Sequence, residues 1–391
     1  MTSGNEQQWN SEALSFQGTT LLKEGDYDKA LESAERVLDK EPNHAEALGT
    51  KGTVLRMRDN FETAAKELTR ATQLAPNTAW LHAELGETLR MQRRYEEALQ
   101  ALERALNLDP DYDFALGTKG VVLAEMDRYQ DALATLDLAP AADPNYPYTL
   151  VVSGQILCEI AQYKLALQEL NLALDRDSQN VMALNVKGWA LQNLGSHYLQ
   201  EATGVYETAL QKELSQVAEL FLRTNHGRAL SLRGEEHRAT MEYRRAIEIG
   251  SKLTAKWDAD VLAYLAWCYF GLEQYSESVR LLAPALSLDR TLVFAQFDLA
   301  LALLHTDRLR HALREYHLAL QLTQAKHVLR RRGLLHVALC DLEAALAKRP
   351  RLARLDEVEE ARRLLRNAQE NTEKESTTHL QEIADLQTKR G

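Results

Sequence analysis

Apolar residues recur at helical spacing in two consecutive stretches between positions 79 and 110 of this chain. The first stretch carries Leu81, Leu85 and Leu89, and the second carries Ala98, Leu102 and Ala105. The polar residues at 92–94 separate the two stretches. Asp109 and Pro110 follow the second one, and proline stops a helix because it lacks an amide proton and clashes with the preceding turn. The pattern therefore predicts two antiparallel helices joined by a tight turn.

The same pattern returns with a constant 34-residue step. Four kinds of position share this step: prolines (Pro42, Pro76, Pro110, Pro144), glycines (Gly18, Gly52, Gly86, Gly120, Gly154, Gly188), alanines (Ala30, Ala64, Ala98, Ala132, Ala166) and aromatics (Tyr27, Phe61, Tyr95, Tyr129, Tyr163). A fixed period at several positions is typical of stacked copies of one small unit. Gly86 and Ala98 are expected to be small because the two helices of a pair approach closely there.

These positions resemble the signature of the tetratricopeptide repeat (TPR) family. Five regular repeats begin at Ser11, Ala45, Ala79, Asp113 and Pro147. Weaker copies follow to about residue 324, with extensions near 211–217 and 250–258. The resemblance implies an all-α fold, a right-handed α-solenoid of about nine TPR-like helix pairs plus C-terminal capping helices, whose stability comes from stacking between neighbours.

The chain accordingly divides into six predicted segments. They are a polar N-terminal segment (1–10), five regular repeats (11–180), irregular repeats with extensions (181–258), two further repeats (259–324), C-terminal capping helices (325–370) and a polar, flexible tail (371–391).

Composition supports a polar-surfaced helical stack. Hydrophobic residues make up 45% and charged residues 26% of the chain. We expect no membrane span, since no apolar run approaches the roughly 20 residues that a spanning helix needs, and no signal-peptide core near the N-terminus. The three cysteines, Cys158, Cys268 and Cys340, are far apart, which favours buried thiols in a reducing cytoplasm over a zinc site.

The TPR resemblance also implies which residues face the concave groove. Large side chains recur at those positions of the first helix of each pair. They are Trp80, Phe114, Tyr148, Met182, Trp189, Phe221, Trp267, Phe270, Phe294 and Phe297, with Arg56 and Arg90 one turn from the groove positions of their helices. Partly exposed rings would suit the anchoring of a peptide. The alternative is that the rings at the second position only pack against the second helix of the preceding pair.

Two charge patterns bear on the partner. The lysine and arginine positions with which some TPR proteins hold a terminal carboxylate are here Ser15, Thr19, Gly49, Thr53, Ala83 and Glu87, which argues against such a clamp. A basic cluster of Lys326, Arg330, Arg331 and Arg332 lies in a stretch of positive charge, whereas the whole chain has a net charge of −11. The cluster either contacts an acidic partner or complements the acidic body of the chain. The overall acidity disfavours nucleic acid.

No residue pattern indicates catalysis, a cofactor or a metal. The Gly-Thr-Lys-Gly runs at 49–52 and 117–120 lack the spacing and the preceding strand of a phosphate loop. Two functions stay open for a non-enzymatic protein. One is a scaffold or adaptor that binds a peptide or partner-protein segment in its aromatic groove, and the other is a regulatory subunit that clasps a separate enzyme.

Overall fold

The computed structural model describes residues 2–139, 148–253 and 258–388. Contacts divide the chain into two compact units, which we call unit 1 (Met1–Thr149) and unit 2 (Leu150–Gly391). This division falls before the irregular repeats predicted at 181–258. The expected repeat-ending Pro144, the start of the fifth repeat at Pro147 and part of the extension at 250–258 lie outside the described residues.

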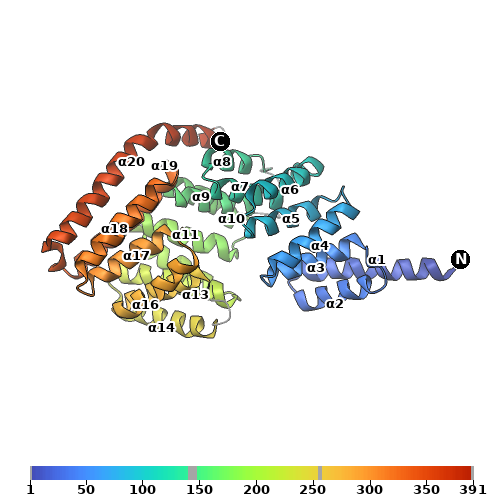
Figure 1. Cartoon of the computed structure of the whole chain (residues 1–391), viewed down its shortest axis with the longest axis horizontal. Helices are drawn as coiled ribbons and strands as arrows, with labels where there is room; N and C mark the ends of the chain where they lie inside the picture. The colour runs from blue at the N-terminus through green and yellow to red at the C-terminus, as the bar shows by residue number, and fades with distance from the viewer. Residues whose placement is uncertain (1, 140–147, 254–257, 389–391) are drawn as a thin grey trace. The chain divides into compact units, whose positions relative to one another are not determined.

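The described part of unit 1 contains four helical hairpins (Figure 1). Their helices are α1 (Thr2–Lys23), α2 (Tyr27–Leu38), α3 (Ala45–Met57), α4 (Phe61–Leu74), α5 (Ala79–Met91), α6 (Tyr95–Leu108), α7 (Asp113–Glu125) and α8 (Tyr129–Leu136). We call the first helix of each pair the A helix and the second the B helix. Helix α1 begins at Thr2, so the segment expected to precede the first repeat is the start of its A helix.

Unit 2 continues the series with five hairpins among its described residues. Their helices are α9 (Tyr148–Glu159), α10 (Tyr163–Arg176), α11 (Val181–Leu194), α12 (Leu199–Ala209), α13 (Gln216–Leu232), α14 (Glu236–Lys252), α15 (Ala259–Gly271), α16 (Tyr275–Leu288), α17 (Val293–Leu304) and α18 (Leu309–Gln324). Helix α9 begins with the last two residues of unit 1. Two long helices follow, α19 (Val328–Lys348) and α20 (Asp356–Thr388). The described residues contain no strand, which confirms the predicted all-α fold of stacked hairpins.

The 34-residue period has a direct structural cause. A Cβ atom on Gly52, Gly86, Gly120 or Gly154 would lie only 2.6 to 2.7 Å from the leucine sixteen positions later, on the B helix of the same hairpin. Real Cβ atoms do not approach other atoms so closely, so these positions must stay small. The alanine of each B helix, such as Ala98, is fully buried at the same contact. The predicted close approach is confirmed.

The turns between A and B helices repeat as well. Asp59, Arg93, Asp127 and Ala161 all have positive φ angles between 57° and 60° and stand one repeat length apart. Each ends its A helix in the left-handed conformation, and the next residue donates a backbone hydrogen bond back into the last turn, as Asn60 does to the carbonyl of Leu55. The turn geometry therefore closes each hairpin at the same point.

Helix α20 runs without a break to Thr388, where the sequence suggested a separate flexible tail from residue 371. Its inner stripe changes from apolar to small polar residues and back. Thr372 and Ser376 are buried, and their hydroxyls donate to the carbonyls of Ala368 and Glu373. Ile383 is again fully buried. Hydroxyl groups satisfied by the helix's own carbonyls can be buried cheaply, so the polar composition did not end the helix.

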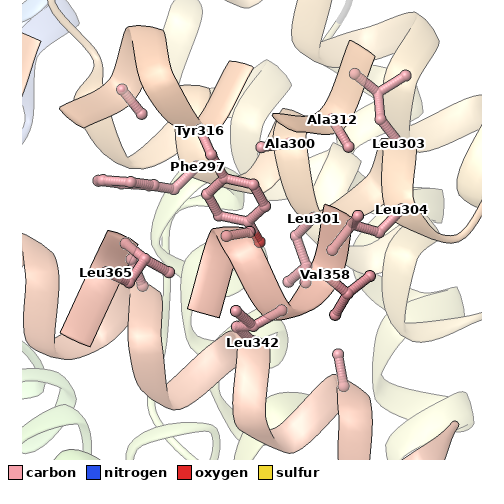
Figure 2. Packing of buried hydrophobic residues seen from close by; sticks show 14 of the residues in the cluster. Phe297, Ala300, Leu301, Leu303, Leu304, Ala312, Tyr316, Leu342, Val358 and Leu365 are labelled. Atoms are coloured by element: carbon pink, nitrogen blue, oxygen red, sulfur yellow. The ribbon is translucent and has the colours of Figure 1, made fainter. Parts of the chain in front are cut away.

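One large core lies where α17, α18, α19 and α20 meet (Figure 2). Phe297 and Leu301 of α17, Tyr316 of α18 and Leu342 of α19 are all buried there, together with Val358 of α20. Helix α19 therefore packs on the A helix of the last hairpin as well as on α20.

Candidate functional site

The A helices of unit 1 carry a ladder of aromatic rings, each resting on the preceding A helix. Trp80 of α5 covers Gly49 of α3, where a Cβ atom would overlap the indole ring. Tyr148 of α9 covers Gly117 of α7 in the same way. Phe114 of α7 stacks with Tyr148, with ring centroids 5.9 Å apart. All three rings remain partly exposed. They pack against a neighbour and stay partly exposed, and their place in a peptide-binding groove stays a prediction.

Ion pairs join successive A helices beside this ladder. Arg56 of α3 pairs with Glu84 of α5 at 2.9 Å, and both side chains are 14% exposed. Arg90 of α5 contacts Glu87 of its own helix at 2.8 Å and Glu125 of α7 at 2.6 Å. Burial, reinforced by the charge of Glu87, raises the pKa of Tyr148 to about 12. The two predicted arginines are therefore neutralised within the face rather than free to bind an anion.

The predicted groove residues of unit 2 lie in a different setting. Five of them, together with residues of α19, line one cavity: Met182, Trp189, Trp267, Phe294 and Phe297. The other two lie outside its lining. Phe221 stacks on Tyr264, with ring centroids 4.2 Å apart. Phe270 packs between Trp267 and His305. Burial lowers the pKa of His305 to about 4.

Helix α19 lies against the A helices of unit 2. A Cβ atom on Gly333 would overlap the carbonyl oxygen of Glu159, at the end of α9. Arg332 donates from Nη1 to the carbonyls of Ile160 and Ala161, at 2.9 and 3.0 Å. These carbonyls belong to the C-terminal end of an A helix, where unpaired acceptors and the negative end of the helix dipole favour a cation.

Further along α19, two contacts extend the same arrangement to the next A helices. His336 Nε2 lies 3.3 Å from the carbonyl of Asn193, near the end of α11. Asp341 pairs with Arg228 of α13, and the two side chains are only 11% and 14% exposed. Arg228 also lies over the ring of Trp267 on α15, 5.1 Å from its centroid. Helix α19 thus crosses the A-helix face of unit 2, where the sequence predicted only a helix capping the end of the stack.

The basic cluster of the sequence takes part in this docking. Arg330 pairs with Glu159 at 2.8 Å, Arg331 pairs with Glu375 at 3.0 Å, and Arg332 holds the end of α9 as described. Lys326 forms no ion pair with a described residue. Three of the four cations therefore have partners inside unit 2, and their contact with an acidic partner stays a prediction.

Sequence reasoning missed the polar residues that α19 meets. Arg228, Asp298 and Asp341 lie at the centre of the contact and were not among the predicted groove positions. Two irregularities were visible nearby. Asp298 is the single charged residue of the apolar helix α17, and Gly333 stands inside a helix, where glycine costs about 1 kcal/mol relative to alanine unless something approaches closely.

The described residues hold no cluster of three or more His, Cys, Asp or Glu side chains arranged to bind a metal. None of the described helices combines the length and the apolar content needed to cross a lipid bilayer. Lys51 and Lys119 of the two Gly-Thr-Lys-Gly runs lie in A helices and pair with Glu67 and Glu103 at 3.6 and 3.4 Å. These lysines contribute to contacts between helices.

The described ranges contain nine hairpins, and their A helices stack against one another. This arrangement defines a helical-hairpin repeat protein. Residues 21–86 and 89–152 match the family model described as tetratricopeptide repeat. The chain thus contains tetratricopeptide repeats. Its fold is that of a scaffold for protein–protein interaction.

The chain is similar to several solved structures at low sequence identity. The human IFIT1 dimer with PPP-AAAA is 16% identical, with a TM-score of 0.51 over 71% of this chain and 72% of that one. A tetratricopeptide repeat protein from Parabacteroides merdae is 15% identical, with a TM-score of 0.48 over 66% of this chain and 99% of the other. A thermophilic TPR protein of Thermus thermophilus is 21% identical, with a TM-score of 0.42 over 46% of this chain and 98% of its own. None of the curated protein sequences compared with the chain matches it significantly.

Proposed function

We propose that the A-helix face of unit 1 binds an extended peptide or a segment of a partner protein. The observation that carries this proposal is the ladder of Trp80, Phe114 and Tyr148, whose rings are fixed by their neighbours and yet partly exposed. Rings held in one orientation lose little entropy on binding and bury a large area, so they serve well as anchors. Within the described residues of unit 1, no helix beyond the hairpins lies on this face.

The paired charges favour an uncharged peptide segment in contact with the rings. Arg56 and Arg90 are held by Glu84, Glu87 and Glu125, so these two arginines offer no free cation to an acidic segment. An apolar segment gains binding energy from the rings and carries no desolvation cost for an ion. We therefore expect aromatic or aliphatic side chains in the bound segment.

The test is selection of peptides from a displayed library on the full chain, followed by fluorescence titration of the best binder. Replacing Trp80, Phe114 and Tyr148 together by alanine should weaken binding at least tenfold while circular dichroism shows the same helix content. The matched control replaces Leu74 and Leu108 by alanine, because these exposed leucines lie near the ends of B helices in the same unit. Equal affinity of the triple variant and the control would reject the proposal.

A second candidate, a regulatory protein, is supported by the place of α19. This helix lies on the A helices of unit 2, where a partner would otherwise bind. A partner for this face would have to displace α19, and the release of α19 would be the signal. Replacing Arg332 by alanine removes its bonds to two carbonyls and should raise the affinity of any peptide selected on unit 2. A peptide that binds unit 2 with the same affinity in the wild type and in the Arg332→Ala variant would argue against this second function.

A further inference from the structure

Helix α19 covers the A-helix face of unit 2 incompletely and leaves a cavity of about 400 Å³. Ligand sites for small molecules usually range from about 300 to 1,000 Å³ and combine apolar walls with a few polar groups. Here the walls include the rings of Trp189, Tyr264, Trp267, Phe294 and Phe297. Such walls suit the flat or alkyl part of a small organic molecule.

The ionisable residues that line the cavity leave one negative charge without an opposite partner. The charged residues of the described lining are Glu159, Arg228, Asp298, Arg330 and Asp341. Arg330 pairs with Glu159, and Arg228 pairs with Asp341. Asp298 forms no hydrogen bond or ion pair with the described residues. The charges of the lining therefore sum to −1 when all groups are ionised, and the surplus is at Asp298.

Four other ionisable groups surround Asp298 from the elements packed against α17. They are Arg228 of α13, Asp341 of α19, Tyr264 of α15 and Tyr316 of α18. Burial and the neighbouring Asp341 raise the pKa of Asp298 well above its usual range, and Arg228 only partly offsets this. A carboxyl in this position lacks a donor that satisfies it, and the cavity beside it is the open side.

We propose that this cavity binds a small organic cation, a primary amine or a guanidinium compound, with Asp298 as its counter-ion. The cationic group would donate hydrogen bonds to the Asp298 carboxylate, and its alkyl chain would lie along Trp189 and Trp267. A cation close to an indole face is attracted by the ring quadrupole, and hydrogen-bonded pairs of opposite charge are stronger than neutral hydrogen bonds.

The closure by α19 makes the occupant a small molecule. Gly333 lies against the backbone at Glu159, and Arg332 and His336 hold the ends of α9 and α11, so the helix blocks a long peptide from crossing this face. An anion is disfavoured because Arg228 and Arg330 are already neutralised. The charge complementarity with Asp298 thus selects a compact cation.

Isothermal titration calorimetry on the full chain tests the proposal with agmatine and butylamine as probes and pentanoate as the anion of similar length. We expect at least one of the two cations to bind and pentanoate not to bind. The Asp298→Asn variant should weaken cation binding at least tenfold. The matched control is Asp307→Asn, because Asp307 is exposed in the turn after α17 and its φ of 56° suits asparagine. Binding of neither cation, or equal affinity in wild type and D298N, would overturn the proposal.

A second measurement keeps the test decisive if D298N does not fold. Burial raises the pKa of Asp298, and a cation bound beside it would lower that pKa, so binding shifts the carboxyl towards its ionised form. Wild-type binding should therefore release a proton, seen as different heats in two buffers of unequal ionisation enthalpy, and the affinity should rise with pH. Cation binding with no proton release and no pH dependence would overturn the role of Asp298.

Discussion

In unit 1 the A helices present partly exposed rings to solvent, whereas in unit 2 helices of the same kind are covered by α19. Both units use one hairpin, with small residues at the close approach and a left-handed residue at the turn. The difference lies in what meets the A helices. In unit 1 Trp80 and Tyr148 rest on the preceding A helix, and charges pair across helices at the surface. In unit 2 a helix from the C-terminal part of the chain takes that place.

The comparison teaches that the repeat fixes the shape of a hairpin but leaves its A-helix face available for different uses. Unit 2 uses the face to hold α19, and it buries ionisable groups to do so. Glu169, Asp298, His305 and Asp341 all lie in this unit with pKa values shifted mainly by burial. In unit 1 the shifted carboxyls, such as Asp26 and Glu62, are surface groups whose pKa values are lowered by lysine partners. Stability should therefore respond to charge and pH mainly in unit 2.

The largest effect should come from the buried pair beneath α19. Replacing Arg228 by methionine leaves Asp341 without its cation, and removing one partner of a buried pair costs about 3 to 5 kcal/mol. Hydrogen exchange should show the loss in peptides of unit 2 and not in peptides of unit 1. The double variant Arg228→Met with Asp341→Leu should recover part of the stability. An equal increase in hydrogen exchange in the peptides of both units would contradict the difference between the units.

A pH effect of similar size should come from Glu169. Burial raises its pKa to about 7 in the folded protein, above the ordinary value of 4.5. The folded state then binds more protons than the unfolded state between these values, so stability falls as pH rises through that window, by about 3 kcal/mol when complete. Urea unfolding at pH 5 and pH 8 should show this loss in the wild type and a smaller loss in Glu169→Gln. The same slope in both proteins would contradict the account.

The next largest loss of stability should come from a substitution at Gly333. Alanine at this position would place a Cβ atom against the backbone at Glu159, and overpacking of this kind costs about 1 to 3 kcal/mol. Exchange should rise in peptides of α19 and at the end of α9. The matched control is Gly204→Ala in α12, where a Cβ atom would meet nothing within 4 Å. Because alanine favours the helix over glycine, this variant should be more stable than the wild type by up to about 1 kcal/mol. Two variants of equal stability would show that α19 is not held this closely.

The smallest effect should come from the ion pair of unit 1. Replacing Arg56 by methionine removes its bond to Glu84, a partly buried pair, and should cost about 1 kcal/mol. The loss should appear in exchange of α3 and α5 only. A larger loss than that of Arg228→Met would reverse the comparison between the units.

Local features of the fold were predictable because they depend on residues close in sequence. The helical hairpins, the small residues at Gly86 and Ala98 and the repeat length all follow from periodicity on the scale of a single repeat. The ladder of Trp80, Phe114 and Tyr148 was predictable for the same reason, since the family pattern marks the second position of each A helix.

The covering of unit 2 could not be predicted, because it depends on contacts between distant residues. Arg332 meets Ile160 across 172 positions, and no periodicity connects them. The arginine cluster left two interpretations open, an acidic partner or the acidic body of the chain, since sequence alone does not show that its partners are backbone carbonyls and Glu159. Gly333 and Asp298 were the two irregularities that pointed to close packing and to a polar centre.

The most direct test of the central claim is zero-length cross-linking of the full chain by carbodiimide at a dilution that keeps links within one molecule. Lys348, at the end of α19, lies 2.8 Å from Glu236 at the start of α14, and both are exposed enough to react. The account predicts an amide bond between these two residues, found by mass spectrometry, alongside the link between Lys51 and Glu67 in unit 1 as a positive control. Recovery of the control link without any link from Lys348 to Glu236 would contradict the placement of α19 on unit 2.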